Sequence, residues 1–190
     1  MASHPVTRYT PEQYLEIERA AAFRSEYISG DMVAMSGASR PHNVISGNLH
    51  AALHNALELQ PCEVYMNNMR VNVGAAFFYP DVVVACPEIQ LLDDHADTLL
   101  NPTVIIDVLS PSTEAYDRGE KFARYSEIPS LQDYILVSQD RCRIEQFARQ
   151  SGGKWLLSVF TTPESIVDLS AIGCDLKVAN AYRKVAFAAQ

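Results

Sequence analysis

The sequence predicts an α/β fold in which helices flank a mixed β-sheet. Two apolar, β-branched runs, 79–85 and 103–109, have the composition of strands buried on both faces. Apolar residues recur at helical spacing over 41–60, which indicates an amphipathic helix that covers a sheet. A third helix, expected over 113–127, lies between two strands and predicts one β-α-β crossover.

The first half of the chain is expected to alternate helices with short strands. Thr10-Pro11-Glu12-Gln13 supplies an N-cap, a proline at the first helical position and a capping-box glutamine, so a helix is predicted over 11–22. Ser29-Gly30-Asp31 is a turn-forming cluster inside a hairpin over 26–35. The helix over 41–60 follows, and residues 62–73 are expected to form a strand.

The second half contains the two most apolar strands and a meander. Residues 86–101 are rich in Pro, Asp and Asn and are predicted to be a loop between the two buried strands. After the 113–127 helix we expect strands over 132–138, 141–148 and 154–160, then a short strand and a helix within 168–190.

Length and composition favour one soluble domain. The 190 residues are 48% hydrophobic and 20% charged, as in a globular domain with a sizeable core, so we expect a single domain over 1–190. No segment resembles a signal peptide or a membrane span, which predicts a cytoplasmic protein without a membrane partner. The four cysteines are scattered within apolar runs, so we expect neither a disulfide framework nor a structural zinc site.

The net charge of −8 argues against a broad nucleic-acid-binding face, because phosphate binding depends on Lys and Arg. Residues 1–95 hold 5 basic and 11 acidic side chains, whereas residues 96–190 hold 10 basic and 12 acidic. Any phosphate-binding surface is therefore expected to be local and to lie in the second half.

Each buried strand carries one aspartate, Asp81 or Asp107, and a buried carboxylate costs several kcal/mol unless it is paired or binds a cation. Two aspartates on neighbouring strands can hold a hard cation such as Mg²⁺, which takes one or two carboxylates plus water and substrate phosphate. Two alternatives remain open at this point: Asp81 ends a strand after Pro80, or each aspartate pairs with an arginine.

The segment after Asp107 favours the metal hypothesis. A helix begins just beyond that strand, and Arg118, Lys121 and Arg124 follow one another at intervals of three, which predicts a basic face beside the carboxylates. Such a cation can orient an attacking water or stabilise charge on a phosphoryl oxygen. The alternative is a solvated helix face with Asp117 and Lys121 as an ordinary i, i+4 ion pair.

These residues resemble a known family. YPDVVVAC, then Asp107 in IIDVLSPST, then YDRGEKFARYSEIPSLQDYILV are similar to the Uma family of putative restriction endonucleases, in the PD-(D/E)XK nuclease-like superfamily. SEYISGDMVAMSGAS with His42 and the late strands extend the resemblance over most of the chain. The resemblance implies a restriction-endonuclease-like mixed sheet flanked by helices, a magnesium site at Asp81 and Asp107, and a catalytic lysine.

The chain departs from the superfamily pattern at two positions. The standard lysine would stand two residues after the second acid, at Leu109, so the resemblance transfers that role to Lys121 on the following helix. The family also more often has glutamate where this chain has Asp107. Lys121→Ala is expected to lower any cleavage rate by about two orders of magnitude or more while leaving folding and metal binding nearly intact.

Glu26 and three histidines complete the candidates. Glu26 resembles an acidic residue that the superfamily contributes to its metal site, the alternative being a hairpin residue that faces solvent. We interpret His42 as a structural residue near a helix start rather than one that orients a water. His50 and His54 have the i, i+4 spacing of metal ligands but lack a third ligand, so we expect them at the surface.

The sequence therefore predicts a magnesium-dependent endonuclease that hydrolyses DNA, with manganese as a substitute ion. Asp81 and Asp107 would hold one octahedral ion at oxygen distances of roughly 2.0–2.2 Å; Lys121 would help to activate water, and Glu26 would complete the site. The alternative is a catalytically inactive module of the same fold that binds nucleic acid or protein. A homodimer is compatible with either.

Overall fold

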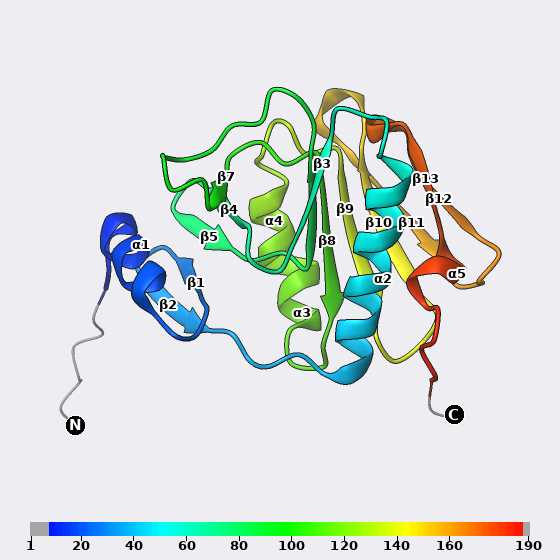
Figure 1. The fold of residues 1–190 in the computed structure, drawn as a ribbon, viewed down its shortest axis with the longest axis horizontal. Helices are drawn as coiled ribbons and strands as arrows, with labels where there is room; N and C mark the ends of the chain where they lie inside the picture. Colours follow the sequence, from blue (N-terminus) through cyan, green and yellow to red (C-terminus); the bar gives the residue numbers. More distant parts are fainter. Residues whose placement is uncertain (1–7, 188–190) are drawn as a thin grey trace.

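The computed structural model describes residues 8–187 and has the predicted α/β class, with helices packed on two mixed β-sheets (Figure 1). The capping box at Thr10 forms as predicted. The α-helices are α1 (Pro11–Ala20), α2 (Arg40–Ala56), α3 (Glu114–Tyr116), α4 (Phe122–Tyr125) and α5 (Val178–Ala181).

The larger sheet has six strands in the order β11-β10-β9-β8-β6-β3. β8 and β9 are parallel and the other neighbours are antiparallel, so the chain between β8 and β9 makes the predicted crossover. The bounds are β3 (Glu63–Met66), β6 (Val82–Ala85), β8 (Val104–Leu109), β9 (Asp133–Ser138), β10 (Ile144–Arg149) and β11 (Trp155–Phe160).

The second sheet has five strands in the order β2-β1-β5-β4-β7. Its bounds are β1 (Ser25–Ile28), β2 (Asp31–Ala34), β4 (Arg70–Val73), β5 (Ala76–Phe78) and β7 (Thr98–Leu99). The prediction of one strand over 62–73 was wrong. Asn67 adopts a left-handed conformation with φ of 57° and Asn68 N–H donates to the carbonyl of Met66, so the chain turns there and its two halves, β3 and β4, join different sheets.

Both faces of the six-stranded sheet are covered. On one face, Val82, Val84, Val104 and Ile106 pack against the apolar side of α2 and against the C-terminal hairpin. On the other face, Val83, Ile105 and Leu109 pack with residues of β4 and β5 and with Tyr125 of α4. Because alternate residues of β6 and β8 enter two different cores, both strands are apolar throughout except at Asp107 of β8.

α1 and the β1–β2 hairpin form one end of the molecule, shown in blue in Figure 1. They join the rest through the pairing of β1 with β5 and through a small aromatic core of Tyr14, Tyr27 and Phe77, whose ring centroids lie 5.1–6.0 Å apart.

The predicted helix over 113–127 is not a single α-helix. Its middle, η1 (Asp117–Lys121), is a π-helical turn between α3 and α4. Such turns are rare and often accompany functional side chains. After β11, β12 (Ile166–Leu169) and β13 (Cys174–Lys177) form a hairpin. The short strand and the helix predicted within 168–190 are present as β13 and α5, whereas β12 is an additional strand. The last three residues of that prediction lie outside the described residues.

The expectation of no disulfide was wrong. Cys62 and Cys86 form a disulfide with Cα atoms 4.1 Å apart, whereas Cys142 and Cys174 are free. The strand register explains the pairing, because Glu63 lies opposite Ala85 and the next step places Cys62 opposite Cys86. Across residues 8–187, every helix is too short or too polar to cross a bilayer.

Candidate functional site

The register of β6 and β8 brings Asp81 and Asp107 to neighbouring positions. Val82 lies opposite Ile106, so the next step along the pair places Asp81 opposite Asp107. The negative charge of Asp81 is also one of the influences that raise the pKa of Asp107. Two carboxylates 26 residues apart in the sequence thus meet at one end of a strand pair.

Asp81 is held by two donors from different elements. Its Oδ1 lies 2.6 Å from Nε2 of His42, in the first turn of α2, and its Oδ2 accepts the N–H of Val108 at 2.7 Å. Burial lowers the pKa of His42, but the hydrogen bond and charge of Asp81 outweigh burial and raise it. The pair is therefore charge-assisted and ties the start of α2 to the start of β6.

Asp107 is buried, with 3% of its surface exposed. Its Oδ2 accepts the hydroxyl of Tyr134 at 2.9 Å and lies 3.3 Å from Nζ of Lys121. Burial raises the pKa of Asp107 to about 7, and the negative charges of Asp117 and Asp81 add to this, while the ammonium of Lys121 opposes it.

Lys121 connects three acidic side chains. Its Nζ lies 3.2 Å from Glu26, 3.3 Å from Asp107 and 3.7 Å from Asp117, and only 5% of the residue is exposed. Burial lowers the pKa of Lys121, but the facing carboxylates, Asp107 first, raise it well above its usual value. Lys121 is therefore a buried ammonium ion balanced by carboxylates.

Glu26 reaches this cluster from β1, in the other sheet. Its Oε1 contacts Lys121 and also accepts the N–H of Tyr79, at 3.2 Å, just before Asp81 in the sequence. The alternative in which Glu26 faces solvent does not hold, since its side chain is only 13% exposed.

The predicted basic face of the 113–127 helix does not exist as a single face. Lys121 points into the protein, whereas Arg118 forms an ion pair with Glu114 at 2.7 Å and another with Glu145. The ion pair of Asp117 with Lys121 is present beside the contact with Asp107. Among residues 8–187, neither Asp81 nor Asp107 pairs with an arginine; the cationic neighbours are His42 for Asp81 and Lys121 for Asp107.

The chemical type of the donor atoms at this site fits a hard cation. Asp81 and Asp107 offer carboxylate oxygens, which magnesium prefers, and two carboxylates suffice when water and phosphate fill the remaining positions. Within residues 8–187, no three His, Cys, Asp or Glu side chains already converge as a complete metal site. An ion at Asp81 would compete with His42 and the Val108 N–H, and at Asp107 with Lys121.

Two tyrosine hydroxyls beside this cluster have unmet hydrogen bonds. The hydroxyls of Tyr116 and Tyr125 are buried and have no hydrogen-bond partner among the described residues. Burial raises the pKa of both, and the charges of Lys121 and Glu26 act on each. Because an unpaired buried hydroxyl costs about 1–3 kcal/mol, the site favours an added polar group such as water or a hydrated ion here.

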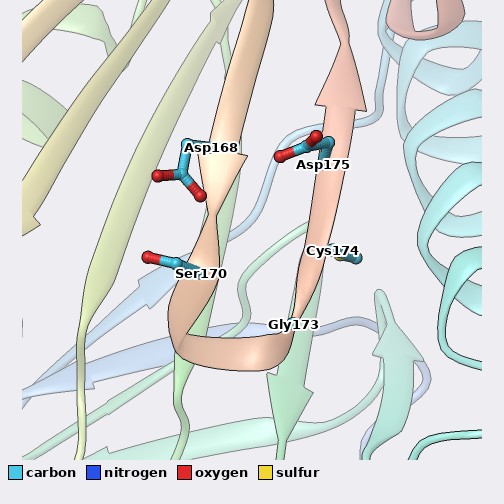
Figure 2. Close-up of a pocket in the computed structure, with 5 residues that line it drawn as sticks. All are labelled: Asp168, Ser170, Gly173, Cys174 and Asp175. Atoms are coloured by element: carbon cyan, nitrogen blue, oxygen red, sulfur yellow. The ribbon is translucent and has the colours of Figure 1, made fainter.

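Two other features lie outside this cluster. His50 and His54 are half-buried and exposed on α2, where their rings stack with centroids 5.8 Å apart. A hollow of about 350 Å³ lies at the β12–β13 hairpin, lined by Asp168, Ser170, Gly173, Cys174 and Asp175. Figure 2 shows the carboxylate of Asp175 directed towards Asp168 across the hairpin. None of the predicted site residues lines this hollow.

The structure adds His42, Asp117 and Tyr134 to the predicted residues. His42 had been interpreted as structural, and only the register of α2 against β6 reveals its contact with Asp81. Asp117 was visible as a helical neighbour of Lys121. Tyr134 gave no signal of its own, because a tyrosine within an apolar strand usually belongs to the core.

Comparison with known proteins gave three kinds of match. The family model "Uma2: Putative restriction endonuclease" matches residues 11–179. Two uncharacterized proteins of Synechocystis sp. are similar: slr1290 is 34% identical over 97% of both chains, and sll1609 is 32% identical over 85% of this chain and 92% of its own. A crystal structure of a putative nuclease of the DUF820 family from Anabaena variabilis has a TM-score of 0.75 at 17% identity, covering 92% of this chain and 97% of the other.

Proposed function

Since the chain belongs to the Uma2 family of putative restriction endonucleases, we propose that it is a magnesium-dependent endonuclease that hydrolyses phosphodiester bonds in DNA. The observation that carries the proposal is the convergence of Asp81, Asp107, Glu26 and Lys121 from four separate segments of the chain. Asp107 and Lys121 are buried, and Asp81 and Glu26 are partly buried. Withdrawing charged groups from water costs stability, so their presence in one place favours a functional role.

In this proposal Asp81 and Asp107 hold the cation and Glu26 completes its surroundings. When bound there, magnesium supplies positive charge that polarises a phosphoryl oxygen. The N–H of Val108 fixes one oxygen of Asp81, so this carboxylate keeps its orientation when His42 moves away from the other.

Lys121 acts in this proposal as a hydrogen-bond donor. Its raised pKa keeps it protonated, and an ammonium can orient a water molecule or stabilise negative charge on a phosphoryl oxygen. Asp107 of β8 and Asp117 of η1 both contact Nζ, and the hydroxyl of Tyr134 donates to Asp107, so the ammonium and its acceptor are both positioned.

DNA would be bound through few phosphate contacts. The chain carries a net charge of −8, and Arg118 is engaged by Glu114 and Glu145. We therefore expect the affinity for DNA to fall less steeply with salt than for a protein with a broad basic face.

One observation favours a second candidate, a catalytically inactive module that binds nucleic acid or protein. Both oxygens of Asp81 already have protein partners, and Lys121 already neutralises Asp107. A site satisfied in this way can be retained for stability alone.

Cleavage and metal binding separate the two candidates. The endonuclease proposal expects magnesium-dependent cleavage of plasmid DNA by the unmodified protein, lost in Asp81→Ala and retained in the control Asp175→Asn, which changes an exposed carboxylate of the β12–β13 hairpin. Titration with manganese should show one bound ion in the protein and none in Asp81→Ala. Manganese binding without cleavage, or neither, would favour the inactive module.

A further inference from the structure

β11 is an edge strand with an unusual composition. It pairs with β10 on one side, and among the described residues no strand pairs with its other side. Its sequence, Trp-Leu-Leu-Ser-Val-Phe, has no charged residue and no proline. The opposite edge of the same sheet, β3, carries Glu63, and the edge strand β2 of the second sheet begins with Asp31. Charged residues and proline are the usual protection of an exposed edge, so β11 lacks it.

The register shows which main-chain groups of β11 face outward. Gln150 N–H donates to the carbonyl of Lys154, and these two residues continue the β10–β11 register beyond Arg149 and Trp155. Hydrogen-bonded pairs alternate along an antiparallel ladder, so Leu156 and Ser158 bond to β10. The N–H and C=O groups of Trp155, Leu157 and Val159 therefore point away from the sheet.

The side chains of this edge are also exposed. Leu156, Leu157 and Val159 are 55%, 49% and 43% exposed, a concentration of apolar surface within four residues. Trp155 stands beside them and is partly buried against Phe122. The edge thus offers both unpaired main-chain groups and apolar contact area.

We propose that β11 pairs with β11 of a second copy of this chain, antiparallel about a two-fold axis at Leu157. The axis places Leu157 opposite Leu157 of the second copy and Trp155 opposite its Val159. All three outward-facing residues then find outward-facing partners, and an aromatic side chain meets a β-branched one, a favourable cross-strand pair.

A second copy fits this edge for an electrostatic reason. Two chains of net charge −8 repel each other over most of their surfaces, and contact costs least where both surfaces are uncharged. The pairing joins the two six-stranded sheets edge to edge. It rests on the fold alone and is independent of the proposed nuclease activity.

The first test is the oligomeric state in solution, measured by light scattering after gel filtration over a range of concentrations. The protein should have twice the monomer mass, and Leu157→Lys should shift it to the monomer. Val33→Lys is the matched control, since Val33 is also 49% exposed and also lies on an edge strand, β2; it should leave the dimer intact. Circular dichroism and a urea titration verify that each variant is folded, and Val159→Lys provides a second variant at the same edge.

The second test is cross-linking, which also checks the register. With Cys142 and Cys174 replaced by serine, Leu157→Cys should form an intermolecular disulfide with oxidised glutathione, because Cα atoms in a hydrogen-bonded antiparallel pair are about 5.5 Å apart. Val159→Cys should not, because the two copies of residue 159 lie four residues apart along the strands, about 13 Å.

Two results would overturn the proposal. One is a monomer at all concentrations up to about 1 mM, where association would be worth only about 4 kcal/mol. The other is a dimer that survives Leu157→Lys, or that cross-links through residue 159 instead of residue 157.

Discussion

Replacement of Lys121 by methionine removes a positive charge where Glu26, Asp107 and Asp117 converge, while a side chain of similar length remains. Both Lys121 and Asp107 are at least 95% buried, so the carboxylates keep their desolvation cost and lose their counterion. Removal of one partner of a buried ion pair costs about 3–5 kcal/mol. We expect a loss of this size well above neutral pH, where Asp107 is charged, which is a large part of the stability of a domain.

The loss should depend on pH. Burial already raises the pKa of Asp107 to about 7, and the ammonium of Lys121 holds it down, so the pKa rises further in Lys121→Met. Above that pKa the carboxylate is charged and unbalanced, and the variant is least stable. As the pH falls through the pKa of the variant, protonation removes the charge, so the part of the deficit due to Asp107 should shrink and be lost by about pH 7, where Asp107 takes up its proton in the unmodified protein as well.

The assay is urea denaturation of the protein and of Lys121→Met at several pH values, with Lys154→Met as the control because Lys154 is exposed. The control should change the free energy of unfolding by no more than about 0.5 kcal/mol. Asp107→Asn combined with Lys121→Met should recover part of the loss, since the pair is then neutral. Equal effects of Lys121→Met and Lys154→Met at every pH would refute the view of Lys121 as a buried counterion.

Three further predictions concern residues outside the ion cluster. Leu109→Ala should cost about 2–5 kcal/mol in urea denaturation and leave manganese affinity unchanged, because Leu109 is a buried core residue; a loss of metal binding in a folded variant would contradict this. Burial raises the pKa of Asp133 from 3.8 to about 6, so its charged form opposes folding. Asp133→Asn should therefore be more stable than the unmodified protein by up to about 3 kcal/mol above pH 6, and this gain should be lost as the pH falls to about 4. Equal stabilities of the two proteins at pH 8 would exclude this explanation. Asp168 and Asp175 face each other across β12 and β13, so Asp175→Lys should raise the free energy of unfolding by at most about 1 kcal/mol in low salt and by less in high salt; a decrease in both would show that the repulsion is unimportant.

The local elements of the fold were largely predictable because their signals lie within a few residues. The capping box at Thr10, the turn at Gly30 and the two apolar strands each depend on neighbours in the sequence. The break of the 62–73 strand at Asn67 was missed, because both halves have strand composition and only their partners distinguish them. The Cys62–Cys86 disulfide was missed for a related reason, since it follows from the register of β3 against β6.

The candidate site was also predictable only in part: its main residues could be predicted, but the contacts between them could not. Asp81 and Asp107 were visible as charges within apolar runs, and Lys121 through the family resemblance. The convergence of three carboxylates on Lys121 could not be predicted, and it changes one expectation. Lys121→Ala should destabilise the fold rather than leave it nearly intact. Contacts such as His42 with Asp81, or Glu26 with Lys121, join elements from different parts of the chain and depend on how α2 and the second sheet dock.

The pairing of β6 with β8 makes the positions of Asp81 and Asp107 independent of most of the residues that lie between the two strands in the sequence. The positions of Asp81 and Asp107 depend on the ladder Val82–Ile106, Val83–Ile105 and Val84–Val104. The excursion between Ala85 and Thr103 is anchored by the disulfide at Cys86 and by β7, which pairs with β4. Residues 87–96, most of which are exposed, lie between these two anchors. This stretch can therefore tolerate insertions and sequence changes without displacing either acidic residue, which makes it the natural place to graft new recognition segments beside an unchanged centre.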